Sequence, residues 1–108
     1  MSQVSNAGLI GYSASKGALI SGARGMSIEL SKNNIRVNCI SPGYIQTEMM
    51  KQVEENMSVV EKKELKEGYL LGLGCPEDVA NSCIYLLSDA SKWVTGINLV
   101  IDGGYTAK

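Results

Sequence analysis

The sequence predicts an α/β fold in which two parallel strands form the trailing part of a larger doubly wound sheet. Two short runs rich in β-branched residues, 35–41 and 97–101, alternate with segments of helical periodicity. Strands that are joined through a helix form a right-handed parallel unit. Two parallel strands cannot bury both faces of a sheet, so we expect further strands beside them. The expected order is helix, strand, helical insertion, helix and strand.

The first helix is expected to run from Tyr12 to about Lys32. Its apolar residues recur at helical spacing, with small residues among them. Gly17, Gly22 and Gly25 each cost about 1 kcal/mol relative to alanine inside a helix. That cost suggests that another backbone approaches this helix closely. Asn33-Asn34 is expected to end it.

The middle of the chain predicts a strand and then a charged helical insertion. The strand covers Ile35–Ser41, and Pro42-Gly43 stops it in a turn. Thr47 is a suitable N-cap for the helix that follows. The stretch from Glu48 to Glu67 holds six Glu and four Lys among methionines and valines. It fits a solvated helix resting on a core, or a mobile lid over an apolar pocket, where flexible methionines suit variable shapes.

A second helix and a last strand complete the predicted order. Residues 70–74 form a loop, and Pro76 suits the first position of a helix with Glu77 and Asp78 in its first turn. A turn at 94–96 precedes the strand Ile97–Ile101, which ends at Asp102-Gly103-Gly104. The face of the helix that we expect to be buried consists of Val79, Ala80, Cys83, Ile84, Leu86 and Leu87.

The composition is that of a soluble globular protein. The 108 residues are 44% hydrophobic and 19% charged, with a formal net charge of −1. This charge gives no reason to expect nucleic acid or a membrane surface as a partner. No apolar run approaches the roughly 20 residues of a membrane span. The first residues show no signal peptide, since no basic region precedes a long apolar stretch.

The cysteines and the absence of histidine restrict the chemistry. Cys39, Cys75 and Cys83 are an odd number, form no Cys-x-x-Cys pair and have no histidine to complete a zinc site. We interpret them as reduced thiols of a cytoplasmic protein and expect no metal. Without histidine, acid–base chemistry must use tyrosine, lysine, a carboxylate or a thiol.

Tyr12 and Lys16 are the candidate catalytic pair. Residues four apart share a helix face, and the ammonium of Lys16 would favour the phenolate of Tyr12. The position of Tyr12 near the helix N-terminus acts in the same direction. Both effects would lower the phenol pKa from about 10 and make Tyr12 a general acid/base. The spacing alone is a weak signal, because an ordinary helix with a surface lysine shows it too.

The pair belongs to a series of motifs that occur in one order. They are Tyr12-Ser13-Ala14-Ser15-Lys16-Gly17-Ala18, Arg36-Val37-Asn38-Cys39-Ile40-Ser41-Pro42-Gly43, Thr47, Pro76-Glu77-Asp78-Val79-Ala80, Val94-Thr95-Gly96 and Asp102-Gly103-Gly104. Over residues 8–106 the chain resembles the short-chain dehydrogenase/reductase family, and within it the 3-oxoacyl-acyl-carrier-protein reductase group. The resemblance implies a Rossmann-like fold, NAD or NADP as cofactor and a small carbonyl or alcohol substrate.

The resemblance also implies roles for single residues. Tyr12 would exchange the proton at the substrate oxygen, and Lys16 would hydrogen-bond the nicotinamide ribose. Pro42 and Gly43 would form the turn beneath the nicotinamide. The backbone of Ile45 would meet the carboxamide, and Thr47 would bond the carboxamide or the pyrophosphate. Tyr12, Lys16, Pro42, Gly43, Ile45 and Thr47 are thus the residues implied to contact the cofactor, whereas Asn38 and Asp102 are implied to be structural.

Several elements of the family pattern are not found in these residues. The glycine-rich turn that holds the pyrophosphate, the Asn-Asn-Ala-Gly stretch and the catalytic serine are missing. The serine belongs about thirteen residues before Tyr12, and Ser2 and Ser5 lie too close to it. We therefore expect residues 1–108 to form the C-terminal, substrate-side part of a single Rossmann-like domain whose nucleotide-binding half is absent, and we expect the isolated chain to be inactive.

The expected function is NAD(P)-dependent hydride transfer to or from a carbonyl or alcohol, in a homodimer or homotetramer. Acyl-carrier reductases often carry an arginine at the end of the tyrosine helix, where this chain has Lys32-Asn33-Asn34. The substrate therefore stays open. An alternative is a catalytically inactive fragment that acts by association, through its exposed helix and sheet edge. A flavodoxin-like domain would need a phosphate loop, and the sequence contains none.

Overall fold

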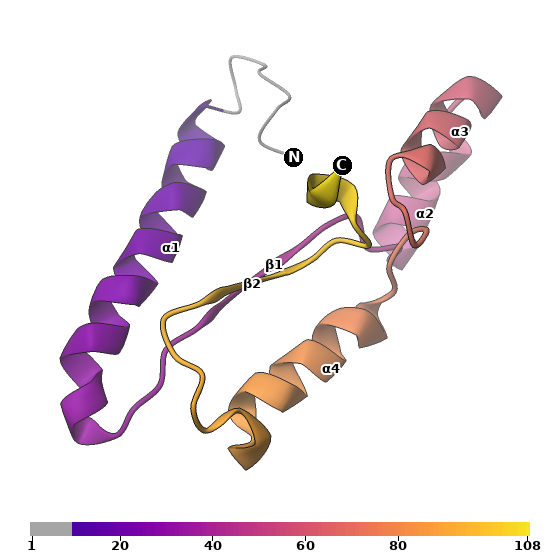
Figure 1. Cartoon of the computed structure of the whole chain (residues 1–108). Coiled ribbons are helices and arrows are strands. Elements are labelled where there is room, and N and C mark those ends of the chain that lie inside the picture. The colour runs from indigo at the N-terminus through magenta and orange to yellow at the C-terminus, as the bar shows by residue number, and fades with distance from the viewer. Residues whose placement is uncertain (1–9) are drawn as a thin grey trace. The chain divides into compact units, whose positions relative to one another are not determined.

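The computed structural model describes the fold of residues 10–108 and the side chains of residues 13–108 (Figure 1). The element order agrees with the predicted one. In chain order the elements are α1 (Ile10–Leu30), β1 (Cys39–Pro42), α2 (Glu48–Glu55), α3 (Val59–Glu67), α4 (Pro76–Leu87) and β2 (Asn98–Ile101), with short 3-10 turns at Ser31–Asn33, Asp89–Ser91 and Tyr105–Ala107.

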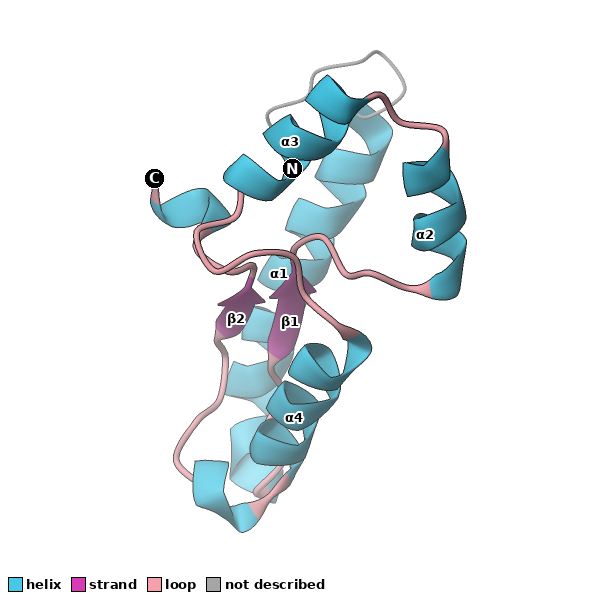
Figure 2. Cartoon of the chain, turned by 90° about the vertical axis from the view of Figure 1, so that its right-hand side faces the viewer, coloured by secondary structure: helices cyan, strands magenta, loops and turns pink. Residues whose placement is uncertain are grey.

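The two strands are neighbours in a parallel sheet (Figure 2). The N–H of Cys39 donates to the carbonyl of Ile97 at 2.9 Å, and the N–H of Gly43 donates to Ile101 at 2.8 Å. From the first of these bonds to the second, the donor and the acceptor residue both move toward the C-terminus, which is the pattern of parallel pairing. The parallel arrangement predicted from the sequence is therefore confirmed.

The first strand is shorter than predicted, because side chains replace part of the strand ladder over residues 35–38, where the N–H of Gly96 still donates to the carbonyl of Val37 at 2.8 Å. The hydroxyl of Thr95 accepts a hydrogen bond from the N–H of Val37 at 3.1 Å. The side-chain oxygen of Asn38 accepts from the N–H of Ile97, also at 3.1 Å. Regular pairing begins only at Cys39, and Pro42 is the last residue of β1 rather than its stop.

The charged insertion is two helices, so its description as a single helix was wrong. Thr47 caps α2 as predicted, because its hydroxyl accepts from the N–H of Met50 at 3.2 Å. Ser58 then starts α3 with a capping box: its hydroxyl accepts from the N–H of Glu61 at 3.1 Å, and the Glu61 carboxylate accepts from the N–H of Ser58 at 3.4 Å. These two helices contain no buried residue.

The described part of the chain divides into two compact units, one of residues 10–39 with 86–99 and one of residues 40–85 with 100–108. In the first unit, Ala23 and Ser27 of α1 are buried, as are Leu86 and Ser91. Ser91 is fully buried, and its hydroxyl donates to the carbonyls of Leu86 at 3.0 Å and Ser88 at 3.1 Å. These contacts fix the chain just after the C-terminus of α4.

Much of the apolar surface expected to be buried is exposed. On α4, Ala80, Ile84 and Leu87 are exposed, which corrects the predicted buried face. On α1, a Cβ atom added at Gly17, Gly22 or Gly25 would meet no atom within 4 Å. The close approach predicted for these glycines is therefore not made within the described part of the chain. Asn34 does end the helical segment as predicted, in the left-handed conformation with φ 61°.

Within residues 10–108, no helix combines the length and the apolar character needed to cross a membrane.

Candidate active site

Tyr12 and Lys16 lie one turn apart near the start of α1. Tyr12 is the third residue of this helix, and its side chain lies outside the described part of the structure. Lys16 is half-buried. The first turn of α1 contains no acidic residue, so no carboxylate there offsets the positive end of the helix dipole. The expectation that this helix terminus favours a negative charge on Tyr12 stays a prediction. The weaker candidates Ser2 and Ser5 lie outside the described residues.

The other predicted site residues follow the carboxyl end of β1, where ligands bind in open parallel sheets. Residues 43–46, which we call the post-β1 segment, pair with the loop before α4 through a parallel bridge between Ile45 and Gly74. The N–H of Gly74 donates to the carbonyl of Tyr44 at 3.1 Å, and the N–H of Gln46 donates to Gly74 at 2.8 Å.

The bridge leaves the main chain of Ile45 available to a ligand. In a parallel bridge the central residue turns its own N–H and C=O away from the partner strand. Within the described residues neither group of Ile45 has a hydrogen-bond partner. A primary carboxamide offers one acceptor oxygen and one NH₂ donor, which complement these two groups. The residues present therefore fit the carboxamide of a nicotinamide, as the resemblance implied.

Thr47 has a second hydrogen-bonding capacity beside its capping role. Its hydroxyl oxygen accepts from the N–H of Met50, and a hydroxyl can also donate its own proton. At the N-cap of α2 it lies beside the positive end of the helix dipole. Either a carboxamide oxygen or a phosphate oxygen could accept from it, so the two implied roles stay open.

Gly43 is required by close packing in the second unit. A Cβ atom at this position would lie 2.8 Å from the Cβ and 2.9 Å from the Cα of Asp102, and 2.9 Å from Cε1 of Tyr69. Such distances leave no room for any side chain. The glycine thus lets the post-β1 segment lie directly against the end of β2.

Asp102 organises the turn that follows β2. Its carboxylate accepts from the N–H of Gly104 at 3.1 Å, from the N–H of Thr106 at 3.0 Å and from the Thr106 hydroxyl at 2.7 Å. The hydrogen bond from the Thr106 hydroxyl, followed by the backbone bonds, holds the pKa of Asp102 below its ordinary value. These contacts support the structural role that the sequence implied.

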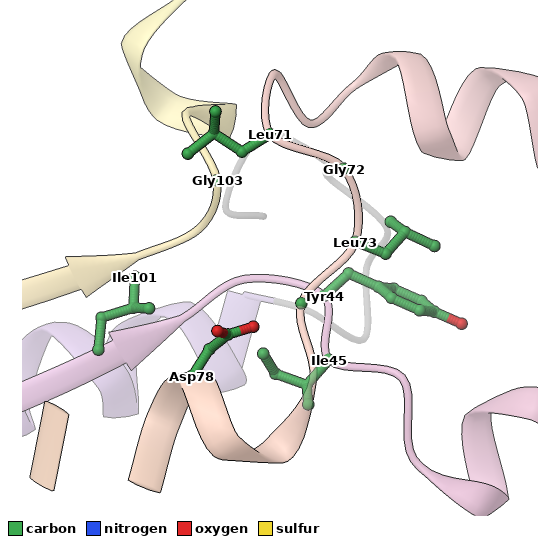
Figure 3. A pocket seen from close by; sticks show the side chains of 9 residues that line it. Tyr44, Ile45, Leu71, Gly72, Leu73, Asp78, Ile101 and Gly103 are labelled. Carbon is green, nitrogen blue, oxygen red and sulfur yellow. The ribbon is translucent and has the colours of Figure 1, made fainter. Parts of the chain in front are cut away.

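A pocket of about 280 Å³ lies beside the post-β1 segment (Figure 3). The Asp78 carboxylate and the side chain of Ile45 face one another in it. The hydroxyl of Tyr44 is buried without a partner among the described residues, and burial, then the charge of Glu54, raises its pKa. The residues that line the pocket are Tyr44, Ile45, Leu71, Gly72, Leu73, Gly74, Asp78, Ile101 and Gly103.

Arg36 and Asn38 form the framework of the first unit. The Arg36 guanidinium donates to the carbonyls of Leu86 at 2.8 Å, Ser88 at 3.3 Å and Val94 at 3.1 Å. Asn38 donates to Val94 at 3.0 Å and accepts from Ile97. The structural role implied for Asn38 agrees with these bonds. The three hydrogen bonds of Arg36 were not predicted. Their only signal in the sequence was a single arginine ahead of an apolar run.

No group of three or more His, Cys, Asp or Glu residues in the described range could hold a metal ion.

Comparisons with known proteins place these segments in a wider context. A family model described as enoyl-(acyl carrier protein) reductase matches residues 1–106. The 3-oxoacyl-acyl-carrier-protein reductase FabG of Chlamydia trachomatis serovar D is 41% identical over 98 residues, which are 90% of this chain and 38% of that protein. The NADP-dependent (R)-specific alcohol dehydrogenase of Lentilactobacillus kefiri is 40% identical over 102 residues, with 90% and 38% coverage.

A solved structure agrees in both fold and sequence. The 4-hydroxyisoleucine dehydrogenase complexed with NADH matches with a TM-score of 0.81 and 43% identity, over 90% of this chain and 40% of that one. The parallel sheet is thus part of a Rossmann-like fold, and the named matches are a reductase, an NADP-dependent alcohol dehydrogenase and a dehydrogenase complexed with NADH. More particularly, the chain belongs to the short-chain dehydrogenase/reductase family. It spans about two fifths of the length of the relatives that it matches.

Proposed function

We propose that this chain carries the catalytic tyrosine and lysine and the substrate-side part of an NAD(P)-dependent short-chain dehydrogenase/reductase. Residues 1–108 would then be the C-terminal part of one Rossmann-like domain, with the dinucleotide phosphates held by a glycine-rich segment outside them. The observation that carries this proposal is the position of Tyr12 and Lys16, one turn apart at the start of α1 with no acidic residue in its first turn.

The roles of the chain's own residues follow from their chemistry. A bound nicotinamide would supply or accept the hydride. Tyr12 gives a proton to the substrate oxygen in reduction and takes it back in oxidation. Lys16 stabilises the phenolate by its charge and hydrogen-bonds the ribose. The main chain of Ile45 orients the carboxamide, and Thr47 bonds the carboxamide or the pyrophosphate.

The substrate class is a carbonyl compound or the corresponding alcohol. The names of the relatives include a 3-oxoacyl-acyl-carrier-protein reductase and an alcohol dehydrogenase, so both a 3-oxoacyl thioester and a small ketone are suitable test substrates. Reduced thiols at Cys39, Cys75 and Cys83, none of which forms a disulfide, favour the cytoplasm as its compartment. We also propose a homodimer or homotetramer as the active form.

A chimera tests the assignment of the pair. Residues 1–106 replace the matching segment of the Chlamydia trachomatis reductase, and oxidation of NADH and NADPH is followed with both substrates. Tyr12→Phe should lower turnover by about 10²–10⁴-fold, because only the proton transfer is lost, and should leave cofactor affinity nearly unchanged. Tyr85→Phe, which removes a half-exposed phenol on α4, is the control and should change neither turnover nor cofactor affinity. Near-normal turnover of Tyr12→Phe would refute the mechanism.

A second candidate is a catalytically inactive chain that acts by association. Exposed apolar side chains on α1 and after α4, such as Ile28 and Trp93, favour it. The chimera distinguishes the two functions, since a folded chimera that binds cofactor without turnover supports association alone. In either case calorimetric titration of the 108-residue chain with NAD⁺ and NADP⁺ should show no tight binding, because these residues include no glycine-rich phosphate loop.

A further inference from the structure

Glu54, near the end of α2, reaches back to the segment that precedes this helix. Its two carboxylate oxygens accept hydrogen bonds from the side-chain amide of Gln46, at 3.2 and 3.4 Å. The Glu54 side chain is half-buried, whereas its neighbours Val53 and Glu55 are exposed. Helical side chains lean toward the N-terminus of their helix, which lets Glu54 contact a residue before the helix start. The contact therefore joins the far end of α2 to the post-β1 segment.

The Glu54 carboxylate lies on one particular side of the post-β1 segment. Neighbouring side chains of an extended segment point to opposite sides. The side chain of Ile45 faces Asp78, whereas that of Tyr44 points another way (Figure 3). Gln46 is two residues after Tyr44 and so shares its side. Burial, and after it the charge of Glu54, raises the pKa of Tyr44, which agrees with a carboxylate on this side.

The post-β1 segment is thus held on three sides, and its fourth side is an open main-chain edge. Along one edge, Gly74 hydrogen-bonds the carbonyl of Tyr44 and the N–H of Gln46. The Ile45 side chain lines the pocket, and Glu54 binds on the opposite side. The N–H and C=O of Ile45 form the remaining edge, which faces away from Gly74. This edge is the one proposed to meet the carboxamide.

The bond between Gln46 and Glu54 also fixes the direction of α2. Two points hold this helix to the segment: the cap that Thr47 supplies at its start, and the Glu54 carboxylate at its end. Without the second point, α2 can pivot about Thr47. Because Gln46 directly precedes Thr47, such a motion is transmitted to the peptide between Ile45 and Gln46, which carries the Ile45 carbonyl.

We propose that Glu54 is a positioning residue of the nicotinamide site: its bond to Gln46 holds α2 on the post-β1 segment and so keeps the main chain of Ile45 in place for the carboxamide. Glu54 acts through Gln46 and does not touch the cofactor. The inference rests on the proposed function, because it takes the post-β1 segment as the nicotinamide contact.

The first test removes the acceptor, with Glu54→Ala in the chimera with the Chlamydia trachomatis reductase. Binding of NADH or NADPH, whichever the chimera oxidises faster, should weaken about fivefold, the worth of one ordinary hydrogen bond. Binding of ADP-ribose or its phosphorylated form, which lacks the nicotinamide ring, should not change. Glu55→Ala removes an exposed carboxylate from the same turn and, as the matched control, should change neither affinity. Equal losses for both ligands, or no loss for either, would overturn the proposal.

The second test exchanges donor and acceptor. Gln46→Glu places two carboxylates against each other and should weaken cofactor binding at least as much as Glu54→Ala. Adding Glu54→Gln to it restores one amide donor and one carboxylate acceptor at unchanged net charge, so this double variant should recover most of the affinity. A double variant that binds no better than Gln46→Glu alone would contradict the direct contact and overturn the inference.

The same chimera separates this inference from the proposed function. If the unchanged chimera oxidised neither NADH nor NADPH, the proposed function would fail, and this inference with it. If the chimera were active and lost turnover in Tyr12→Phe, but bound the cofactor equally well in Glu54→Ala, only the positioning role of Glu54 would be refuted.

Discussion

Gly43 and Asp102 approach so closely that a Cβ atom on Gly43 would lie 2.8 Å from the Cβ and 2.9 Å from the Cα of Asp102. The Cα is main-chain and cannot rotate away. The post-β1 segment therefore lies against the end of β2 because Gly43 has no side chain. This contact connects the segment proposed to hold the nicotinamide with the turn that Asp102 organises.

Gly43→Ala should destabilise the chain by roughly 1–3 kcal/mol, because the added methyl group overpacks the contact with Asp102 and Tyr69. Urea denaturation of the 108-residue chain measures the change. Gly17→Ala is the matched control: its Cβ would meet nothing within 4 Å, and it should stabilise α1 by about 1 kcal/mol through helix propensity. Equal effects of the two substitutions would contradict the packing argument.

Asn38→Ala should cost about 1–3 kcal/mol of unfolding free energy, because it leaves the N–H of Ile97 without its partner and removes one of the two donors to the carbonyl of Val94. The same denaturation experiment tests it. Asn56→Ala removes an exposed amide that donates only to the carbonyl of Gln52 and should change stability by less than about 0.5 kcal/mol. An Asn38 variant as stable as the Asn56 variant would show that the hydrogen bonds of the Asn38 side chain are dispensable.

The hydrogen bonds to Asp102 predict a specific pH dependence. They lower its pKa in the folded chain below the ordinary 3.8. The carboxylate therefore contributes its stability above pH 3.8, and that contribution is lost as the pH falls through the lowered value. The stability difference between the unchanged chain and Asp102→Asn should shrink over this acidic range. Denaturation at neutral and acidic pH checks this, and a difference independent of pH would contradict it.

Lys16→Ala in the chimera should reduce both turnover and cofactor affinity, because Lys16 is proposed to serve the phenolate and the ribose. This outcome differs from that of Tyr12→Phe, which should affect turnover alone. Steady-state kinetics with a separate cofactor titration distinguishes them. Lys62→Ala on α3 removes an exposed lysine and should be neutral. A Lys16 variant with unchanged cofactor affinity would mean that Lys16 only stabilises the phenolate of Tyr12.

The 108-residue chain should self-associate, because large apolar side chains of its first unit are exposed. Leu19 is 67% exposed, Ile28 76%, Leu87 85% and Trp93 98%, more than a stable monomer usually leaves in contact with water. Light scattering at several concentrations measures the mass. Ile28→Lys should shift the population toward monomer, whereas Glu29→Lys, at the exposed neighbouring position, should not. A sharp monomer at all concentrations would disprove the prediction.

Local signals in the sequence were sufficient for the order of elements and for the helix starts. Thr47 and Pro76 begin their helices as predicted, and Asn34 ends the helical segment after α1. Each of these features depends on a few neighbouring residues, which is why the sequence reveals them. The capping box of Ser58 and Glu61 was equally local and was overlooked, so α2 and α3 were taken as one helix.

By itself the sequence determined the family and the helical spacing of Tyr12 and Lys16, because these are properties of short contiguous motifs. Only the tertiary structure decided which main-chain groups find partners. Residues 35–38 are not a strand, because the side chains of Thr95 and Asn38 take up two of the main-chain hydrogen bonds between this segment and the one before β2. Tyr69 lies against Gly43 because residues far apart in sequence fold together. No periodicity or propensity encodes such contacts, since they depend on three-dimensional packing.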